Sequence, residues 1–198
     1  MNNWDIVYKN GRSFTPMNEL YLSELLALLK KKRKGKGIKT VLDLGCGRGG
    51  VVISLAQRKM DVTGVDFSRV AIHEAKKLAS EKGVSARAQF TVHDLEKTHT
   101  LKFNKRFDLV ICKLTYAFLK NKKQFLNSLH KLLAQGGVFV LVTPVLLKGT
   151  HYSAHLKNIS VGKNQTEKSL KKEFGSFTIH YQRYFEDNGL EITYILFN

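Results

Sequence analysis

The chain has 198 residues, of which 43% are hydrophobic and 25% charged, a composition typical of one globular domain with a substantial core. Its two cysteines are too few for a disulfide framework and indicate a reducing compartment. Met1–Asp5 has neither the basic nor the apolar region of a signal peptide, and the apolar stretch Gly136–Leu147 is too short to span a bilayer. We therefore expect a cytoplasmic protein without a membrane segment.

The net charge of +17 arises from 33 lysines and arginines against 16 acids. Such a surface attracts polyanions, so RNA is a candidate partner. The densest cluster, Lys30–Lys36, follows a leucine-rich helical pattern, where cations also suit the end of the helix dipole. A solvated helix end and a nucleic-acid surface therefore both remain open as interpretations of this cluster.

The chain alternates between predicted strands and predicted helices. Helical spacing and glycine stops predict helices over Met17–Lys34, Val51–Arg58, Ser68–Lys82 and Lys122–Leu133. Apolar runs predict strands over Lys39–Leu44, Asp61–Val65, Ala86–Val92, Phe107–Cys112 and Val138–Val142. This alternation indicates a parallel, doubly wound sheet.

The C-terminal pattern differs from the alternation before it. After a loop and a short helix near Thr166–Glu173, two strand-like runs, Phe177–Phe185 and Leu190–Phe197, flank Asp187-Asn188-Gly189, which is a hairpin signal. We therefore predict an α/β, Rossmann-like doubly wound sheet of seven strands, mostly parallel, with an antiparallel C-terminal hairpin. One domain would span 1–198, with an N-terminal arm and helix over 1–37 and the core over 38–198.

Polar residues and glycines stand at successive strand ends, where ligands bind in such sheets. Gly45 and Gly47 allow close backbone approach, and Asp43 beside them can attract an ammonium group. Asp66, at the end of the second strand, can accept hydrogen bonds from both ribose hydroxyls. Asp94, at the end of the third, can accept from an adenine amino group. Phe67 and Leu95 supply apolar walls for the purine.

Four segments carry a family resemblance: Val41–Gly50, Val62–Ser68, Phe107–Val110 and Leu132–Gly137. They resemble, in this order, the first, second and fourth motifs of class I S-adenosylmethionine methyltransferases and their turn into the fifth strand. The resemblance covers nearly the whole chain. It implies S-adenosyl-L-methionine as cofactor and methyl transfer by direct displacement.

Size and the N-terminal segment look most like the small-molecule branch, which includes tellurite-resistance and ubiquinone-biosynthesis-like enzymes. An N-terminal tyrosine often closes over the cofactor in that branch, which would be Tyr8 here. Simple packing of Trp4 and Tyr8 is the alternative. The resemblance places the cofactor along the residues already named and along Cys46 and Lys113 at neighbouring strand ends.

The substrate is expected between the loop after the fourth strand and the segment after the fifth. Tyr116 would hold the nucleophile, and His151 or His155 would take a proton near neutral pH, beside Tyr152. Packing of Tyr116 under the next helix and solvent exposure of the histidines is the alternative. No metal is expected, because His151 and His155 lack a third ligand.

Three other functions are weighed against a small-molecule methyltransferase. Gly45, Gly47 and Gly50 also fit a dinucleotide motif, but Asp43 stands where such sites keep an apolar residue. The basic surface favours RNA as substrate, whereas Cys112–Tyr116 lacks the prolines of amino-directed nucleic-acid enzymes. The third alternative is a non-catalytic protein that binds the cofactor. The oligomeric state is not predicted.

Overall fold

The computed structural model describes residues 3–11, 17–144, 167–175, 178–186 and 190–197. Its central feature is one sheet with the strand order β3-β2-β1-β4-β5-β7-β6. The first five strands are β1 (Thr40–Leu44), β2 (Asp61–Asp66), β3 (Ala88–Val92), β4 (Phe107–Lys113) and β5 (Leu133–Pro144). Neighbouring pairs among these five all run parallel. The predicted α/β Rossmann-like class is therefore confirmed.

Strands and helices alternate because the strands are apolar on both faces. In β1, Val41 joins one core and Leu42 the other, and in β4 Leu109 and Val110 divide in the same way. All four side chains are fully buried. A sheet buried on both faces needs a helix layer on each side, which defines the doubly wound arrangement.

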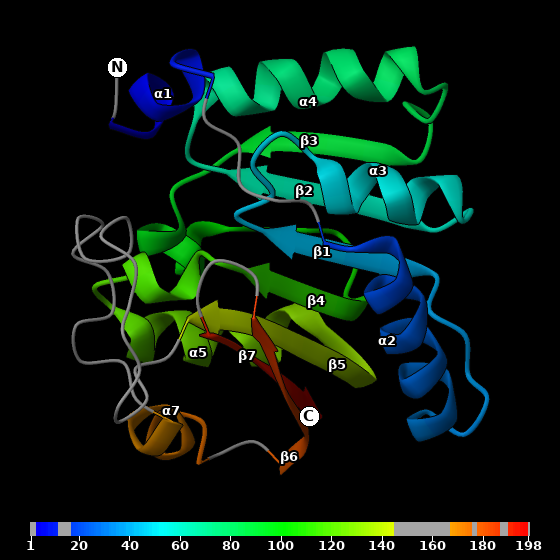
Figure 1. The fold of residues 1–198 in the computed structure, drawn as a ribbon, viewed down its shortest axis with the longest axis vertical. Helices are drawn as coiled ribbons and strands as arrows, with labels where there is room; N and C mark the ends of the chain where they lie inside the picture. The colour runs from blue at the N-terminus through cyan, green and yellow to red at the C-terminus, as the bar shows by residue number, and fades with distance from the viewer. Residues whose placement is uncertain (1–2, 12–16, 145–166, 176–177, 187–189, 198) are drawn as a thin grey trace.

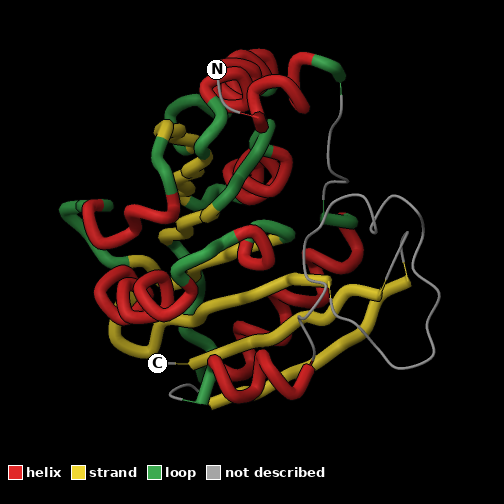
Figure 2. Tube along the Cα trace, turned by 90° about the vertical axis from the view of Figure 1, so that its left-hand side faces the viewer, coloured by secondary structure: helices red, strands yellow, loops and turns green. Residues whose placement is uncertain are grey.

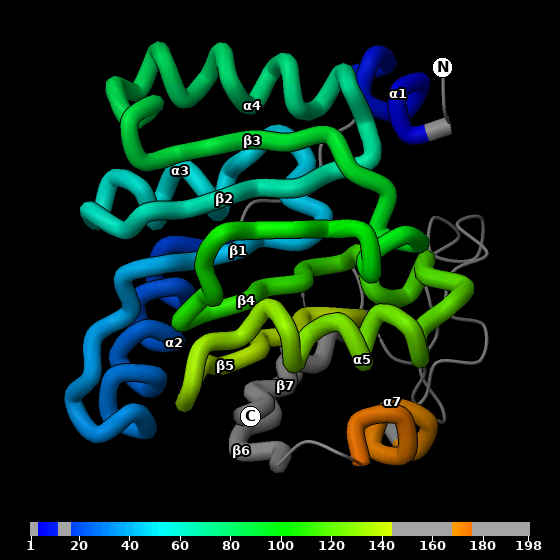
Figure 3. Tube along the Cα trace, turned by 180° about the vertical axis from the view of Figure 1, so that it is seen from behind, coloured from blue at the N-terminus to red at the C-terminus, as the bar shows by residue number. Residues whose placement is uncertain are grey.

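The helices form these two layers. They are α1 (Asn3–Lys9), α2 (Glu19–Lys32), α3 (Gly50–Gln57), α4 (Arg69–Glu81), α5 (Lys122–Leu132) and α7 (Glu167–Glu173), with short 3₁₀ turns η1 (Leu95–Thr100) and η2 (Tyr116–Phe118). α2, α3 and α4 contribute to one core, and α5 and α7 to the other. Figure 1 shows the first layer in front, Figure 3 shows α5 on the opposite face, and Figure 2 shows helices on both sides of the strands.

Beyond β5, two C-terminal strands extend the sheet. β7 (Leu190–Phe197) pairs antiparallel with β5, from Val138 opposite Phe197 to Pro144 opposite Glu191, and also with β6 (Thr178–Glu186). The predicted turn at 187–189 lies outside the described residues. In the part of the chain that the structure describes, no helix is long and apolar enough to cross a membrane.

Two boundaries differ from the sequence prediction. The N-terminal arm contains a helix, α1, whose Asp5 is buried against the start of α4. β5 begins at Leu133, where we predicted the end of a helix, because Leu133 pairs with Phe107 before a register shift. Tertiary pairing thus overrides the local helical pattern at this point.

Sequence order places a binding site at one edge of this sheet. The chain runs outward from β1 to β2 and β3, and then returns to β4 on the other side of β1. Strand order therefore reverses between β1 and β4, and ligands bind beyond the carboxyl ends of strands at such a point. In Figure 1 this edge lies at the arrowheads, on the side of α1, whereas the loop after α2 lies at the other edge.

Candidate active site

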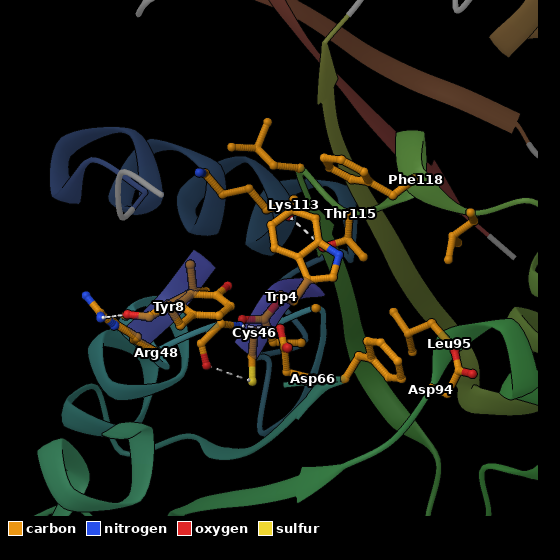
Figure 4. Close-up of a pocket in the computed structure, with 18 of the residues that line it drawn as sticks. Trp4, Tyr8, Cys46, Arg48, Asp66, Asp94, Leu95, Lys113, Thr115 and Phe118 are labelled. Atoms are coloured by element: carbon orange, nitrogen blue, oxygen red, sulfur yellow. Dashed lines mark hydrogen bonds between the residues drawn. The ribbon is translucent and has the colours of Figure 1, made fainter. Parts of the chain in front are cut away.

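A cavity of about 520 Å³ opens at the carboxyl edge of the sheet. It is lined by the glycine loop after β1, the ends of β2 and β4, the start of η1 and the inner side of α1 (Figure 4). Its volume lies in the range of cavities that enclose a small ligand. All ten residues predicted to bind the cofactor line it: Tyr8, Asp43, Gly45, Cys46, Gly47, Asp66, Phe67, Asp94, Leu95 and Lys113.

The glycine loop leaves no space for side chains. Gly45 has a φ of 85°, and a Cβ there would lie 1.9 Å from Thr115 Oγ1. Gly47 has a φ of 51°, and its Cβ would lie 2.7 Å from the Tyr8 hydroxyl. Glycine is thus required twice over, by backbone conformation and by close neighbours. The loop brings bare backbone to the cavity wall.

Asp66 connects the glycine loop to the start of α4. Its Oδ2 accepts from the Gly47 N–H at 2.8 Å and its Oδ1 from the Ser68 N–H at 2.8 Å. Burial raises the pKa of this carboxyl, and the backbone N–H groups of Ser68 and Gly47 oppose that rise. Each carboxylate oxygen can accept more than one hydrogen bond, so acceptor capacity remains for a ligand in the cavity.

Asp43 is a buried carboxylate with an unused acceptor. Its side chain is only 2% exposed, and Oδ1 has no hydrogen-bond partner among the described residues. Burial raises its pKa to about 7, while Lys113 lowers it and Asp66 raises it further. A buried carboxylate without a partner is costly, so a cationic ligand would relieve this site. The ammonium of an adenosyl amino acid fits that requirement.

The far end of the cavity has the composition expected for a purine site. Asp94 caps η1 by accepting from the Glu96 N–H at 3.0 Å, and its side chain is half-buried on the cavity wall. Leu95 is buried, and Phe67 is 42% exposed at the rim. An apolar ring would thus meet hydrophobic walls and one carboxylate acceptor. This arrangement supports the predicted adenine position.

The helix α1 covers the cavity with two aromatic side chains, as Figure 4 shows. Trp4 packs edge-to-face on Phe118 with 4.9 Å between ring centroids, which connects α1 to η2. The carbonyl of Tyr8 accepts from Arg48 Nη2 at 2.9 Å. Asp5, only 5% exposed, accepts from the Ser68 hydroxyl at 2.6 Å. Three contacts therefore hold α1 over the glycine loop.

Tyr116 does not lie where the sequence predicted. Its side chain is fully buried among Phe125 and Phe174, and it does not line the cavity. The hydroxyl donates to Glu173 Oε2 at 2.7 Å. The η2 turn carries Tyr116 into the core below the cavity, so the structure argues against its predicted contact with substrate. His151, Tyr152 and His155 lie outside the described residues.

Sequence reasoning missed part of the cavity wall. Leu114, Thr115 and Phe118 line it from the segment after β4, and Arg48 lines it from the glycine loop. Thr115 belonged to a strand-end segment already singled out, but nothing in the residue types shows which side chain of such a segment faces the ligand. Among the described residues, no cluster of three candidate ligands suits a metal ion.

The cavity is acidic although the chain is strongly basic. Four carboxylates, from Asp43, Asp66, Asp94 and Glu96, line it against the two cations Arg48 and Lys113. In a chain of net charge +17, this inversion favours a cationic ligand over a dinucleotide with its two phosphates. The fold and this cavity together have the features of the class that the sequence motifs resemble, the S-adenosylmethionine-dependent methyltransferases.

Comparison with known proteins identifies the family. A methyltransferase-domain family model matches residues 36–188, and the chain belongs to that family. It is 31% identical over 179 residues to a ubiquinone biosynthesis O-methyltransferase of Haemophilus ducreyi, covering 85% of this chain and 72% of the relative. A protein of the same description from Actinobacillus pleuropneumoniae is 29% identical over 85% of this chain and 73% of its own.

Solved structures support the fold independently. Magnesium protoporphyrin IX methyltransferase from Synechocystis, solved with bound SAH, has a TM-score of 0.69 at 20% identity, covering 98% of this chain and 92% of that one. The [4+2]-cyclase SpnF has a TM-score of 0.71 at 18% identity, over 91% and 73%. One architecture is thus shared by a methyltransferase and a cyclase, so the fold alone does not fix the reaction.

Proposed function

We propose that this methyltransferase transfers the methyl group of S-adenosylmethionine to an oxygen atom of a small molecule. The observation that carries the proposal is the acidic cavity, in which Asp43 Oδ1 has no hydrogen-bond partner among the described residues and over which α1 lies. A cavity of about 520 Å³, with Trp4 packed on Phe118 at its wall, suits a small acceptor better than a nucleic-acid strand. The O-methyltransferase names of the relatives support oxygen as the accepting atom.

Most of the predicted cofactor residues have a defined role in this proposal. Asp43 attracts the ammonium, and the glycine loop supports the amino-acid portion with bare backbone. Asp66 accepts from the ribose hydroxyls, while Asp94, Leu95 and Phe67 hold the adenine. When bound, the cofactor supplies an electrophilic methyl group on its sulfonium. The chain's own contribution to the reaction is to position the acceptor and exclude water.

We also propose a role for the histidines after β5, a single domain and a cytoplasmic location. His151 and His155 follow β5, which ends at the ligand edge, and this place in the chain supports their role as proton acceptors. A single domain with a seven-stranded sheet is supported by the pairing of β7 along Val138–Pro144. The two buried free cysteines agree with the expected cytoplasmic location.

The test is a transfer assay with labelled S-adenosylmethionine and matched acceptors. Phenol, aniline and thiophenol differ only in the accepting atom, and total RNA is assayed in parallel. We expect transfer to phenol and none to RNA, with Asp43→Asn as the inactive control. Transfer to RNA alone would replace this proposal with the nucleic-acid alternative. Tight cofactor binding without transfer to any acceptor would favour a non-catalytic binding protein.

A further inference from the structure

The segment after β4 contains a backbone conformation that needs an explanation. Among the described residues, Lys34, Lys59 and Leu114 are the non-glycine residues with positive φ, at 52°, 65° and 57°. Lys34 and Lys59 follow the ends of α2 and α3, and their N–H groups donate back to Lys31 and Ala56. Such conformations are ordinary at helix ends. Leu114 follows a strand, where a branched side chain avoids this region.

The structure holds Leu114 in this conformation from both sides. The Leu114 N–H donates to the Val142 carbonyl at 2.8 Å, so β5 fixes the start of the turn. Two residues later, Tyr116 is anchored in the core and bonded to Glu173. A strained residue persists where its surroundings determine it, and such residues concentrate at functional sites. The buried Tyr116 thus stabilises the turn and does not line the cavity.

The turn brings the Thr115 side chain to the cavity wall. It packs so closely on the glycine loop that a Cβ at Gly45 would lie 1.9 Å from Thr115 Oγ1 and 2.7 Å from its Cγ2. The hydroxyl donates to the Lys113 carbonyl at 3.2 Å, so its oxygen can still accept a hydrogen bond from a ligand. Figure 4 shows Thr115 beside Trp4, between the glycine loop and Phe118.

From this geometry we propose that Thr115 orients the acceptor oxygen and that Leu114 positions Thr115; the inference rests on the oxygen acceptor of the proposed function. The acceptor O–H donates to Thr115 Oγ1, and this bond strengthens as the acceptor oxygen attacks and its proton becomes more acidic, while the lone pairs of that oxygen stay available for the new bond. That oxygen forms the new bond to the methyl carbon, and the methyl–sulfur electron pair stays on sulfur. The proton of the acceptor leaves to the proton acceptor of the proposed function.

A matched set of variants separates the effect of the Thr115 hydroxyl from the effect of the side-chain shape. Thr115→Val keeps the side-chain shape and removes the hydroxyl, and Thr115→Ser keeps the hydroxyl and removes the methyl. Thr63→Val makes the same change in β2, at a buried threonine away from the cavity. The measurements are kcat for phenol and thiophenol, and the cofactor Kd by calorimetry.

We expect Thr115→Val to lower kcat for phenol about tenfold, the worth of one hydrogen bond formed at the transition state. Its cofactor Kd should stay within about twofold of the wild-type value, since adenine and ribose contacts are untouched. Thr115→Ser should restore most of the turnover, and Thr63→Val should leave it unchanged. Thiophenol, which ionises readily and bonds weakly to a hydroxyl, should respond less than phenol.

Three results would overturn the inference, and each has a different meaning. If Thr115→Val methylated phenol at the wild-type rate, Thr115 would have no part in the reaction and the proposed function would stand. A parallel loss of turnover and cofactor affinity in Thr115→Val would show that the side chain only supports the glycine loop. A wild-type protein that methylates neither probe would overturn both the oxygen acceptor and the role of Thr115.

Discussion

At the scale of single residues, Asp43 shows how a binding site opposes stability. Its carboxyl is buried at 2% exposure with one oxygen unpartnered, and its pKa rises from 3.8 to about 7. The native state therefore binds this proton more tightly than the unfolded chain does. Stability consequently falls as pH rises from about 4 to about 7, and the whole cost is present above that range. The bound ammonium would offset the cost.

Asp43→Asn tests this opposition between binding and stability. At about pH 8 the variant should be more stable than the wild type by roughly 1–3 kcal/mol, because an amide removes the buried charge. The gain corresponds to a rise in Tm of several degrees in a chain of this size. At about pH 4, where the buried carboxyl of the native state is protonated, the difference should shrink. Thermal unfolding at both pH values measures it.

The same variant should lose cofactor affinity, measured by calorimetry at about pH 8, by more than about tenfold. Glu24→Gln, at an exposed position on α2, serves as a control for removing one negative charge. Unchanged stability together with weakened binding would mean that Asp43 already has a partner that relieves its burial.

Asp66 also has a structural role, in addition to the predicted contact with the ribose. Its two oxygens already accept from Gly47 and Ser68, so the side chain orders the glycine loop. Asp66→Ala should therefore weaken cofactor binding more than tenfold, since a hydrogen bond to a charged group is worth roughly 1.5–3 kcal/mol, and should also lower Tm. Calorimetry and thermal unfolding check both. Normal binding by this variant would exclude the ribose role.

At the scale of elements, α1 is the part of the site whose helical structure the sequence patterns did not predict. Its seven residues are too few to form a helix by propensity alone, and its position depends on tertiary contacts. The Asp5 carboxylate accepts from the Ser68 hydroxyl and from the Val70 N–H, at the start of α4. The helix is thus docked on another helix terminus, and Trp4 reaches across the cavity from it.

Trp4 makes closure by α1 measurable, because it is the only tryptophan in the chain. Binding of S-adenosylhomocysteine should change its fluorescence, since the indole lines the cavity. Asp5→Ala should weaken binding roughly threefold to tenfold by loosening α1, because a buried hydrogen bond between side chains is lost. At the same ligand concentration, the fluorescence change of Asp5→Ala should be smaller than that of the wild type. An unchanged titration in Asp5→Ala would contradict a role for this docking contact.

Elements with strong local signals were predictable, and those decided by distant contacts were not. Asp43, Asp66 and Asp94 end parallel strands, so chain order alone brings them to one edge. We predicted that Tyr116 would face the cavity, because no sequence signal shows that η2 begins there and turns its side chain into the core. The left-handed Leu114 is equally hidden, since β5 and the core impose it from outside the segment. Residue types therefore predicted which strand ends line the cavity, but not which side chain the turn after β4 presents to it.

At the scale of the whole molecule, a group of exposed lysines lies at the edge of the sheet opposite the acidic cavity. The cavity at the carboxyl edge is lined by four carboxylates. Lysines precede the strands at the amino edge, where Lys39 precedes β1, Lys59 precedes β2 and Lys105 precedes β4, all exposed. The cluster Lys30–Lys36 lies at this same edge, after α2. A polyanion drawn to these lysines would bind at the edge opposite the cavity.

One member of the cluster is structural. Arg33 Nη2 forms an ion pair with Asp108 at 2.9 Å, its side chain is only 6% exposed, and it also donates to the carbonyls of Gly37 and Gly136. The backbone N–H groups of Lys39 and Thr40 donate to Asp108 as well. Replacing Arg33 together with its neighbours would therefore confuse charge with folding. A clean test changes only the exposed lysines.

Lys31→Gln, Lys32→Gln and Lys34→Gln combined should leave methyl transfer to a small acceptor within about twofold of the wild-type value at moderate salt, because screening removes most of their field at the distant cavity. Thermal stability should also be unchanged, whereas Arg33→Gln alone should lower Tm by breaking its buried contacts. Lys76→Gln and Lys77→Gln on α4 control for lost positive charge. A collapse of transfer in the triple variant, with a matching loss of RNA affinity, would instead make RNA the substrate.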